Sequence, residues 1–184
     1  MKAVHLGLFL ALKFRCLIRN EWQIEREGLK MDKKARKILL LEDDYESMHY
    51  LKEILEQDMK WEAVLTAEEG ILSRLAVEAF DLIVVDIMIH ASSKNQVGQE
   101  VKNIAFENVN WKTTGLEFLH RLRRGEYVKQ AGKGTPADVP VIVLSAVAKD
   151  SGDIQTGQLL AQGYVEKPFR LDDLLSQFRR ILQG

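Results

Sequence analysis

Residues 39–44 read LLLEDD, a run of strand-forming leucines that ends in three consecutive carboxylates. Leucines of this kind belong in a protein core, whereas adjacent negative charges repel one another. The stretch therefore predicts a buried strand whose end carries acidic side chains for a chemical reason.

Four more short apolar runs follow along the chain, separated by segments with helical periodicity. Nearly continuous runs of Val, Ile and Leu are typical of strands buried on both faces of a parallel sheet. The predicted strands cover residues 38–41, 62–65, 81–86, 139–145 and 164–165. Strands that alternate with helices indicate an open, doubly wound α/β sheet.

The helical segments show apolar stripes that predict which side chains face the sheet. Thr66 and Glu69 have the spacing of a capping box that would open the second helix, and a weakly patterned fourth helix is expected within 148–162. The stripes of the other four helices are Met48, Leu51, Ile54 and Leu55; Ile71, Leu72, Leu75 and Ala79; Leu116, Leu119 and Leu122; and Leu174, Leu175, Phe178, Ile181 and Leu182.

Polar side chains are predicted to converge at one edge of this sheet. In doubly wound sheets, ligands bind beyond the carboxyl ends of the strands. Glu42 and Asp43 would lie there after the first strand, Asp86 at the end of the third, Ser145 at the end of the fourth and Lys167 after the fifth. Crowded carboxylates repel unless a cation joins them, and ligands that offer only oxygen favour Mg²⁺. The sequence thus predicts a magnesium site.

From residue 37 to 184 the chain resembles the receiver domain of two-component response regulators. The resemblance rests on four motifs in order, LLLED, LIVVDIM, VIVLSA and GYVEKPF, each at a strand end. It implies a flavodoxin-like fold, with five parallel strands flanked by five helices. It also implies a phosphorelay receiver that a histidine kinase or phosphotransfer protein phosphorylates and that signals by protein contact. Since no output module follows, a stand-alone regulator is expected.

The resemblance assigns roles to the acidic residues. Glu42 and Asp43 match the family's metal-binding pair, and Asp86 matches its phosphoacceptor. Mg²⁺ would be held by Glu42, Asp43, Asp86 and a backbone carbonyl near Met88. Asp44 is expected to cap a helix rather than to bind metal.

The resemblance also assigns roles after the fourth and fifth strands. Ser145 matches the hydroxyl that binds the phosphoryl group, and Lys167 matches the lysine that neutralises it. Tyr164 matches an aromatic switch that rotates inward when Ser145 moves. The peptide bond between Lys167 and Pro168 is expected to be cis, which proline tolerates.

The chain departs from the family after Asp86. Ile89 stands where receivers usually have a proline, and the expected helix glycine, Gly115, lies 29 positions after Asp86. Ordinary connections have about 4–6 residues, so residues 90–114 contain an insertion beside the site. It is either a surface elaboration or a functional lid or docking element.

Composition suggests other properties of the chain. Residues 1–36 carry a net charge of +5 and are interpreted as an N-terminal extension. Their apolar run, residues 3–12, is shorter than the ~20 residues that a membrane span needs. Two interpretations stay open: an amphipathic helix that packs on the domain, or an extension upstream of a true start at Met31. Residues 37–184 carry −6, which argues against nucleic acid as a partner. With Cys16 as the single cysteine, a cytoplasmic protein is expected.

Two alternatives remain open. A pseudo-receiver would share the fold but act as a binding module without phosphorylation. A phosphohydrolase of the haloacid dehalogenase type would need a second acid two positions after Asp86, where the chain has Met88. No enzyme activity is therefore expected beyond Mg²⁺-dependent self-phosphorylation and autodephosphorylation.

Overall fold

A computed structural model of the chain describes residues 35–130, 132–146 and 159–183. Its centre is a parallel sheet in the order β2-β1-β3-β6-β7. The strands are β1 (Lys37–Leu41), β2 (Glu62–Leu65), β3 (Leu82–Asp86), β6 (Val141–Ser145) and β7 (Gly163–Glu166). All five predicted strands are present, and the three central ones are almost completely buried, as their continuous apolar sequences require.

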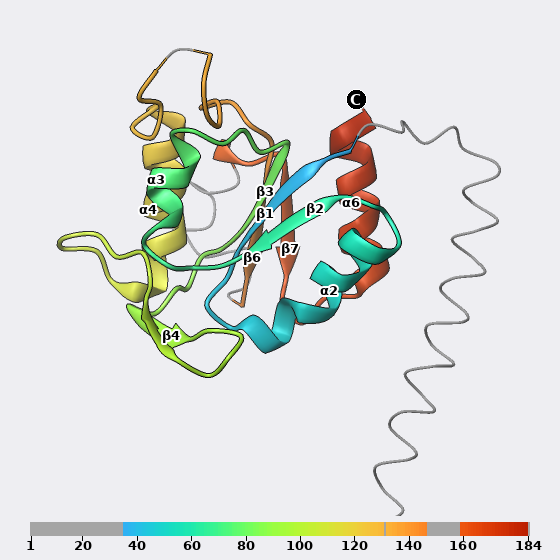
Figure 1. Cartoon of the computed structure of the whole chain (residues 1–184), viewed down its shortest axis with the longest axis horizontal. Helices are drawn as coiled ribbons and strands as arrows, with labels where there is room; N and C mark the ends of the chain where they lie inside the picture. The colour runs from blue at the N-terminus through green and yellow to red at the C-terminus, as the bar shows by residue number, and fades with distance from the viewer. Residues whose placement is uncertain (1–34, 131, 147–158, 184) are drawn as a thin grey trace, which may run out of the picture. The chain divides into compact units, whose positions relative to one another are not determined.

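Helices cover both faces of the sheet, so the predicted doubly wound architecture is confirmed. Figure 1 shows α2 (Tyr45–Gln57) and α6 (Leu171–Gln183) on one face, and α3 (Ile71–Leu75) and α4 (Thr114–Arg123) on the other. The predicted helix within 148–162 falls almost entirely outside the described residues. The extension 1–36, with Cys16 and Met31, lies outside them up to residue 34.

Most of the predicted apolar stripes face the core. All four residues of the α2 stripe are buried. In α4 the structure buries Phe118 together with Leu119 and Leu122, whereas Leu116 is only half-buried. In α6 the residues Leu174, Leu175 and Phe178 are buried, and Ile181 and Leu182 are half-buried.

The predicted start and length of α3 are wrong. The helix begins at Ile71 after Gly70, with no side-chain cap, and ends at Leu75, so that Ala79 lies beyond it and is exposed. Thr66 Oγ1 accepts a hydrogen bond from the backbone N–H of Glu68 instead of capping a helix.

The insertion explains this difference. Residue 68 forms an antiparallel bridge with Asn103, and Glu69 N–H donates to the Lys102 carbonyl at 3.1 Å. Because the backbone of residues 67–69 is hydrogen-bonded to residues 102–104 of the insertion, it does not form a first helical turn before Gly70. At the other end of the helix, Thr135 N–H donates to the Leu75 carbonyl at 2.8 Å. This hydrogen bond from outside the helix replaces the one that a further helical turn would make.

The insertion is folded and shares the core of the domain. Strands β4 (Ser92–Lys94) and β5 (Glu100–Lys102) form an antiparallel hairpin, and a short 3-10 helix, η1 (Trp111–Thr113), leads into α4. Ile89 and Ile104, at either end of the hairpin, are fully buried in the main core cluster. Ile89 N–H donates to the Trp111 carbonyl at 3.1 Å, which draws the two ends of the insertion together.

Within the described ranges 35–130, 132–146 and 159–183, every helix is too short or too polar to pass through a lipid bilayer.

Candidate functional site

The strand register brings two predicted acidic residues side by side. Leu41 at the end of β1 pairs with Val85 of β3, so the next residue of each strand, Glu42 and Asp86, comes to the same edge of the sheet. Both residues are 4% exposed. Two carboxylates in such a position need a nearby cation, because burial removes the water that would otherwise screen them.

Lys167 supplies a positive charge between them. Its Nζ lies 2.5 Å from Glu42 Oε2 and 2.6 Å from Asp86 Oδ2. Its backbone N–H donates to the Ser145 carbonyl at 2.7 Å, which fixes the chain after β7 next to β6. The peptide bond from Lys167 to Pro168 is cis, as expected.

Asp43 completes an acidic cluster. One oxygen from each of Glu42, Asp43 and Asp86 lies within 4.8 Å of the others. Three carboxylates without sulfur ligands form a donor set that fits a hard divalent cation such as Mg²⁺. Asp44 is exposed and caps α2, accepting from Ser47 N–H at 3.3 Å, so its predicted role is confirmed.

The pKa values of Glu42 and Lys167 reflect both their burial and their mutual closeness. Burial, together with the charge of Asp86, raises the pKa of Glu42 to about 7, although Lys167 opposes the shift. Burial alone would lower the pKa of Lys167, but the charges of Glu42 and Asp86 outweigh it and raise that pKa. One lysine thus only partly compensates the carboxylates, and a further positive charge would be favourable.

Asp86 is held in a defined orientation. Its Oδ1 accepts from Met88 N–H at 3.1 Å, while Oδ2 faces Lys167. Gly115 packs against the backbone here: its N–H donates to the Ile87 carbonyl at 2.9 Å, and a Cβ on Gly115 would lie 1.8 Å from the Asp86 carbonyl oxygen. Only glycine permits this approach of α4 to the end of β3.

The residues of the predicted switch lie on the neighbouring strands. Ser145 is fully buried at the end of β6, one position beyond Leu144, which pairs with Asp86. Tyr164 of β7 is half-buried against the core, and its carbonyl accepts from Gln177 Nε2 at 3.3 Å. Their switching role and the metal-binding carbonyl of Met88 stay predictions.

Sequence reasoning missed His90, the first residue of the insertion. Its backbone N–H and its Nδ1 lie 3.1 and 2.9 Å from Asp43 Oδ2. Its ring stacks on Trp111, with centroids 4.2 Å apart and an angle of 18° between the planes. No motif marks this residue, because its importance depends on where the insertion folds.

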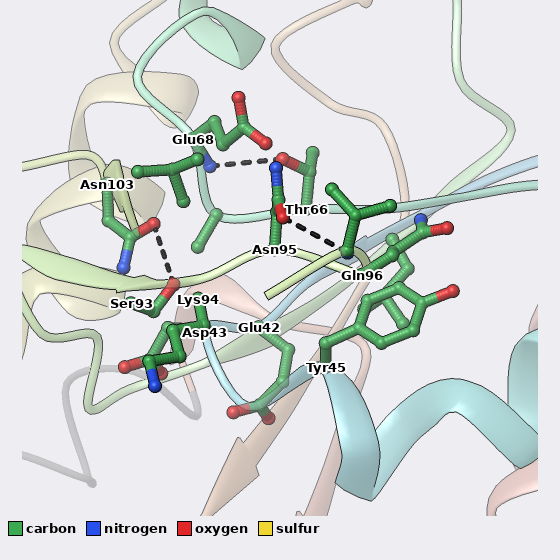
Figure 2. Close-up of a pocket in the computed structure, with 14 residues that line it drawn as sticks. Glu42, Asp43, Tyr45, Thr66, Glu68, Ser93, Lys94, Asn95, Gln96 and Asn103 are labelled. Carbon is green, nitrogen blue, oxygen red and sulfur yellow. Dashed lines mark hydrogen bonds between the residues drawn. The ribbon is translucent and has the colours of Figure 1, made fainter. Parts of the chain in front are cut away.

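A pocket of about 270 Å³ separates the hairpin from the acidic cluster. Figure 2 shows Glu42 and Asp43 on one side of it and residues of the β4–β5 hairpin on the other. Ser93 Oγ and Asn103 Oδ1, 3.3 Å apart, belong to the hairpin side. The insertion therefore adds a wall to the site that its strands alone would not provide.

Comparisons with known proteins find similar sequences and similar folds. No family model matches the chain. The chain is 28% identical over 147 residues to the transcriptional regulatory protein CrdR of Helicobacter pylori, covering 79% of this chain and 54% of that protein. It is also 28% identical over 148 residues to CpxR of Klebsiella pneumoniae, covering 80% and 49%. The chain thus spans about half the length of these curated relatives.

Solved structures show the same fold. The non-phosphorylated HemR receiver domain from Leptospira biflexa superposes with a TM-score of 0.55 at 24% identity, covering 81% of this chain and 95% of that one. A response regulator from Thermotoga maritima gives 0.54 at 23%, covering 82% and 100%. By fold and by sequence similarity, residues 35–183 of this chain are similar to the receiver domains of response regulators.

Proposed function

We propose that the protein is a phosphorylatable receiver that accepts a phosphoryl group on Asp86 in two-component signalling. The observation that carries the proposal is the position of Lys167 Nζ, within 2.6 Å of both Glu42 and Asp86, with Asp43 completing the acidic cluster. Phosphoryl transfer depends mainly on alignment and charge neutralisation, and this arrangement offers both.

The reaction uses an Asp86 carboxylate oxygen as nucleophile. It forms a bond to the phosphorus of a phosphohistidine or a small acyl phosphate, while the bond from phosphorus to the donor breaks. The bonding electron pair stays with the donor, which then takes up a proton from solvent. Lys167, already beside Asp86 Oδ2, neutralises charge on the transferred group, and Ser145 donates a hydrogen bond to it.

Glu42, Asp43 and Asp86 would hold Mg²⁺, with the Met88 carbonyl as a further ligand. When bound, the ion supplies positive charge that offsets the phosphoryl oxygens. The raised pKa of Glu42 is consistent with this assignment, because burial and the nearby charge of Asp86 both disfavour its ionised form and a bound cation would favour it.

The signal would leave the site through Ser145 and Tyr164. A phosphoryl group that draws the Ser145 hydroxyl inward frees space for the half-buried Tyr164 ring, and the altered surface contacts a downstream protein. A histidine kinase or phosphotransfer protein would be the donor, in the cytoplasm, with no nucleic acid or membrane partner.

The test is labelling with acetyl phosphate, followed by intact-mass measurement of an 80 Da addition to the chain. Labelling is expected with Mg²⁺, not with EDTA, and not in the Asp86→Asn variant. Asp44→Asn is the matched control, since Asp44 is an exposed acid outside the cluster. Labelling of Asp86→Asn at the wild-type level would refute the assignment of the phosphoacceptor.

A pseudo-receiver that binds partners without phosphorylation is the second candidate. One observation favours it: the Asp86 side chain is 6% exposed, with Lys167 against it and the insertion nearby. If the wild-type protein neither binds Mg²⁺ nor accepts a phosphoryl group, this alternative replaces the first.

A further inference from the structure

Asp43 is the acidic residue of the cluster whose carboxylate accepts hydrogen bonds from a residue of the insertion, His90. Its Oδ2 lies 3.1 Å from the backbone nitrogen and 2.9 Å from Nδ1 of His90. A carboxylate oxygen only accepts hydrogen bonds, so Nδ1 carries the proton that lies between the two side chains. Two donors from one residue therefore converge on one oxygen atom.

Contacts within the insertion hold one face of the His90 ring and fix the His90 backbone. Trp111 stacks on the ring at 4.2 Å. Asn103, which is 3% exposed, donates from Nδ2 to the His90 carbonyl at 2.9 Å. The neighbouring Ile89 is fully buried, and its backbone N–H donates a hydrogen bond to the Trp111 carbonyl. The backbone donor is thus fixed by the fold, and stacking on Trp111 favours the ring orientation in which Nδ1 faces Asp43.

This arrangement limits how Asp43 can bind a cation. An ionised carboxylate oxygen has about two lone-pair directions, and both on Oδ2 are taken by His90. Oδ1 is the oxygen left for a metal, so Asp43 can act as a monodentate ligand but not as a bidentate one. Mg²⁺ requires near-octahedral coordination and takes single oxygens, whereas Ca²⁺ has higher coordination numbers and often takes both oxygens of a carboxylate.

We propose that His90 is a positioning residue that restricts Asp43 to monodentate binding through Oδ1 and thereby sets a preference of the acidic site for Mg²⁺ over Ca²⁺. The inference rests on the proposed metal-binding function and assigns to the insertion a specific task in it. Hydrogen bonds to metal ligands from outside the coordination sphere typically change metal affinity 10–100-fold, so the effect is measurable.

The experiment is calorimetric titration of the full chain with MgCl₂ and, separately, with CaCl₂. His90→Phe keeps a ring to stack on Trp111 but removes the side-chain donor. His90→Asn loses the stack but keeps a side-chain N–H near the position of Nδ1. Thermal unfolding in EDTA checks that both variants are folded.

In His90→Phe we expect the affinity for Mg²⁺ to fall about 10-fold, and that for Ca²⁺ to fall by less than about threefold, so that the preference for Mg²⁺ decreases. His90→Asn should restore the preference to within about threefold of wild type. A preference in His90→Phe within about twofold of wild type would overturn the inference, as would a failure of His90→Asn to restore it.

Acetyl phosphate labelling of the same samples separates this inference from the proposed function. A wild-type protein that is labelled on Asp86, together with an unchanged His90→Phe preference, overturns the role of His90 alone. Mg²⁺ binding with the expected variant effects but without labelling supports the role of His90 and removes the phosphoacceptor function. A wild-type protein without Mg²⁺ binding overturns both.

Discussion

Replacing Glu42 with Gln should stabilise the metal-free protein at pH 8. Glu42 is 4% exposed, and its pKa in the folded protein is about 7, against an ordinary value of 4.5. The folded state therefore binds more protons than the unfolded state between these two values, and stability falls as the pH rises through this window. Above pH 7 the buried charge costs about 3 kcal/mol, at about 1.4 kcal/mol for each pH unit of the shift.

Glutamine removes this charge but also one acceptor. Glu42 accepts from Lys167 Nζ on Oε2 and from Asp44 N–H on Oε1, and an amide oxygen can serve only one of them well. The lost hydrogen bond costs about 1 kcal/mol, which leaves a net gain of about 2 kcal/mol at pH 8. For a domain of this size, that gain raises the melting temperature by about 4–8 °C.

The assay is thermal unfolding in EDTA at pH 8 and at pH 4, followed by circular dichroism. At pH 4 Glu42 is protonated in the folded state and mostly protonated in the unfolded state, so the variant and the wild type should agree within about 1 kcal/mol. The exposed Glu68→Gln is the control and should show no such pH-dependent difference. A Glu42→Gln variant that is less stable than wild type at pH 8 would refute the argument.

Three further predictions concern other parts of the chain. Ile104→Ala should lower the free energy of unfolding in urea by about 3 kcal/mol, because the side chain is fully buried. Val97→Ala, at the 75% exposed hairpin tip, should lower it by less than about 0.5 kcal/mol. Equal effects of the two substitutions would show that the insertion is not part of the core. Gly115→Ala should lower the free energy of unfolding by more than about 3 kcal/mol and reduce labelling of Asp86, because the alanine Cβ would overlap the Asp86 carbonyl. A variant that is as stable and as fully labelled as the wild type would contradict this prediction. Hydrogen bonds from Arg74 and Lys37 hold the pKa of Glu78 at about 2, so its stabilising effect is present above pH 4.5 and is lost as the pH falls toward 2. Because Glu78 is partly exposed, Glu78→Gln should lower the free energy of unfolding in urea by about 1 kcal/mol at pH 7 and leave it unchanged near pH 2. A difference between variant and wild type that stays the same at both pH values would argue against these ion pairs.

The sheet could be predicted from the sequence because each of its strands can be recognised from its own residues alone. Each strand is a continuous apolar run, and Glu42, Asp86, Ser145 and Lys167 stand at or just after the end of such a run. Parallel pairing then places strand ends at one edge, which is why Glu42, Asp86 and Lys167 could be expected to meet.

What sequence reasoning missed depends on the insertion. The capping pattern of Thr66 and Glu69 is a valid local signal, but pairing with residues 102 and 103 overrides it. His90 is a single histidine without a motif, and its contact with Asp43 spans 47 positions in the chain. Long-range pairing of a segment outside the common fold has no periodicity from which it could be predicted.

The attachment of the insertion determines how far it can move as a lid. Its base is tied to the domain by backbone hydrogen bonds, from Ile104 N–H to the Ala67 carbonyl and from Glu69 N–H to the Lys102 carbonyl. Amide protons of Ile104 and Glu69 should therefore exchange with deuterated solvent as slowly as those of the central strands, since their exposure requires disruption of shared core packing. We therefore expect access to this edge to vary by the reach of a few hairpin side chains rather than by the swing of a whole flap.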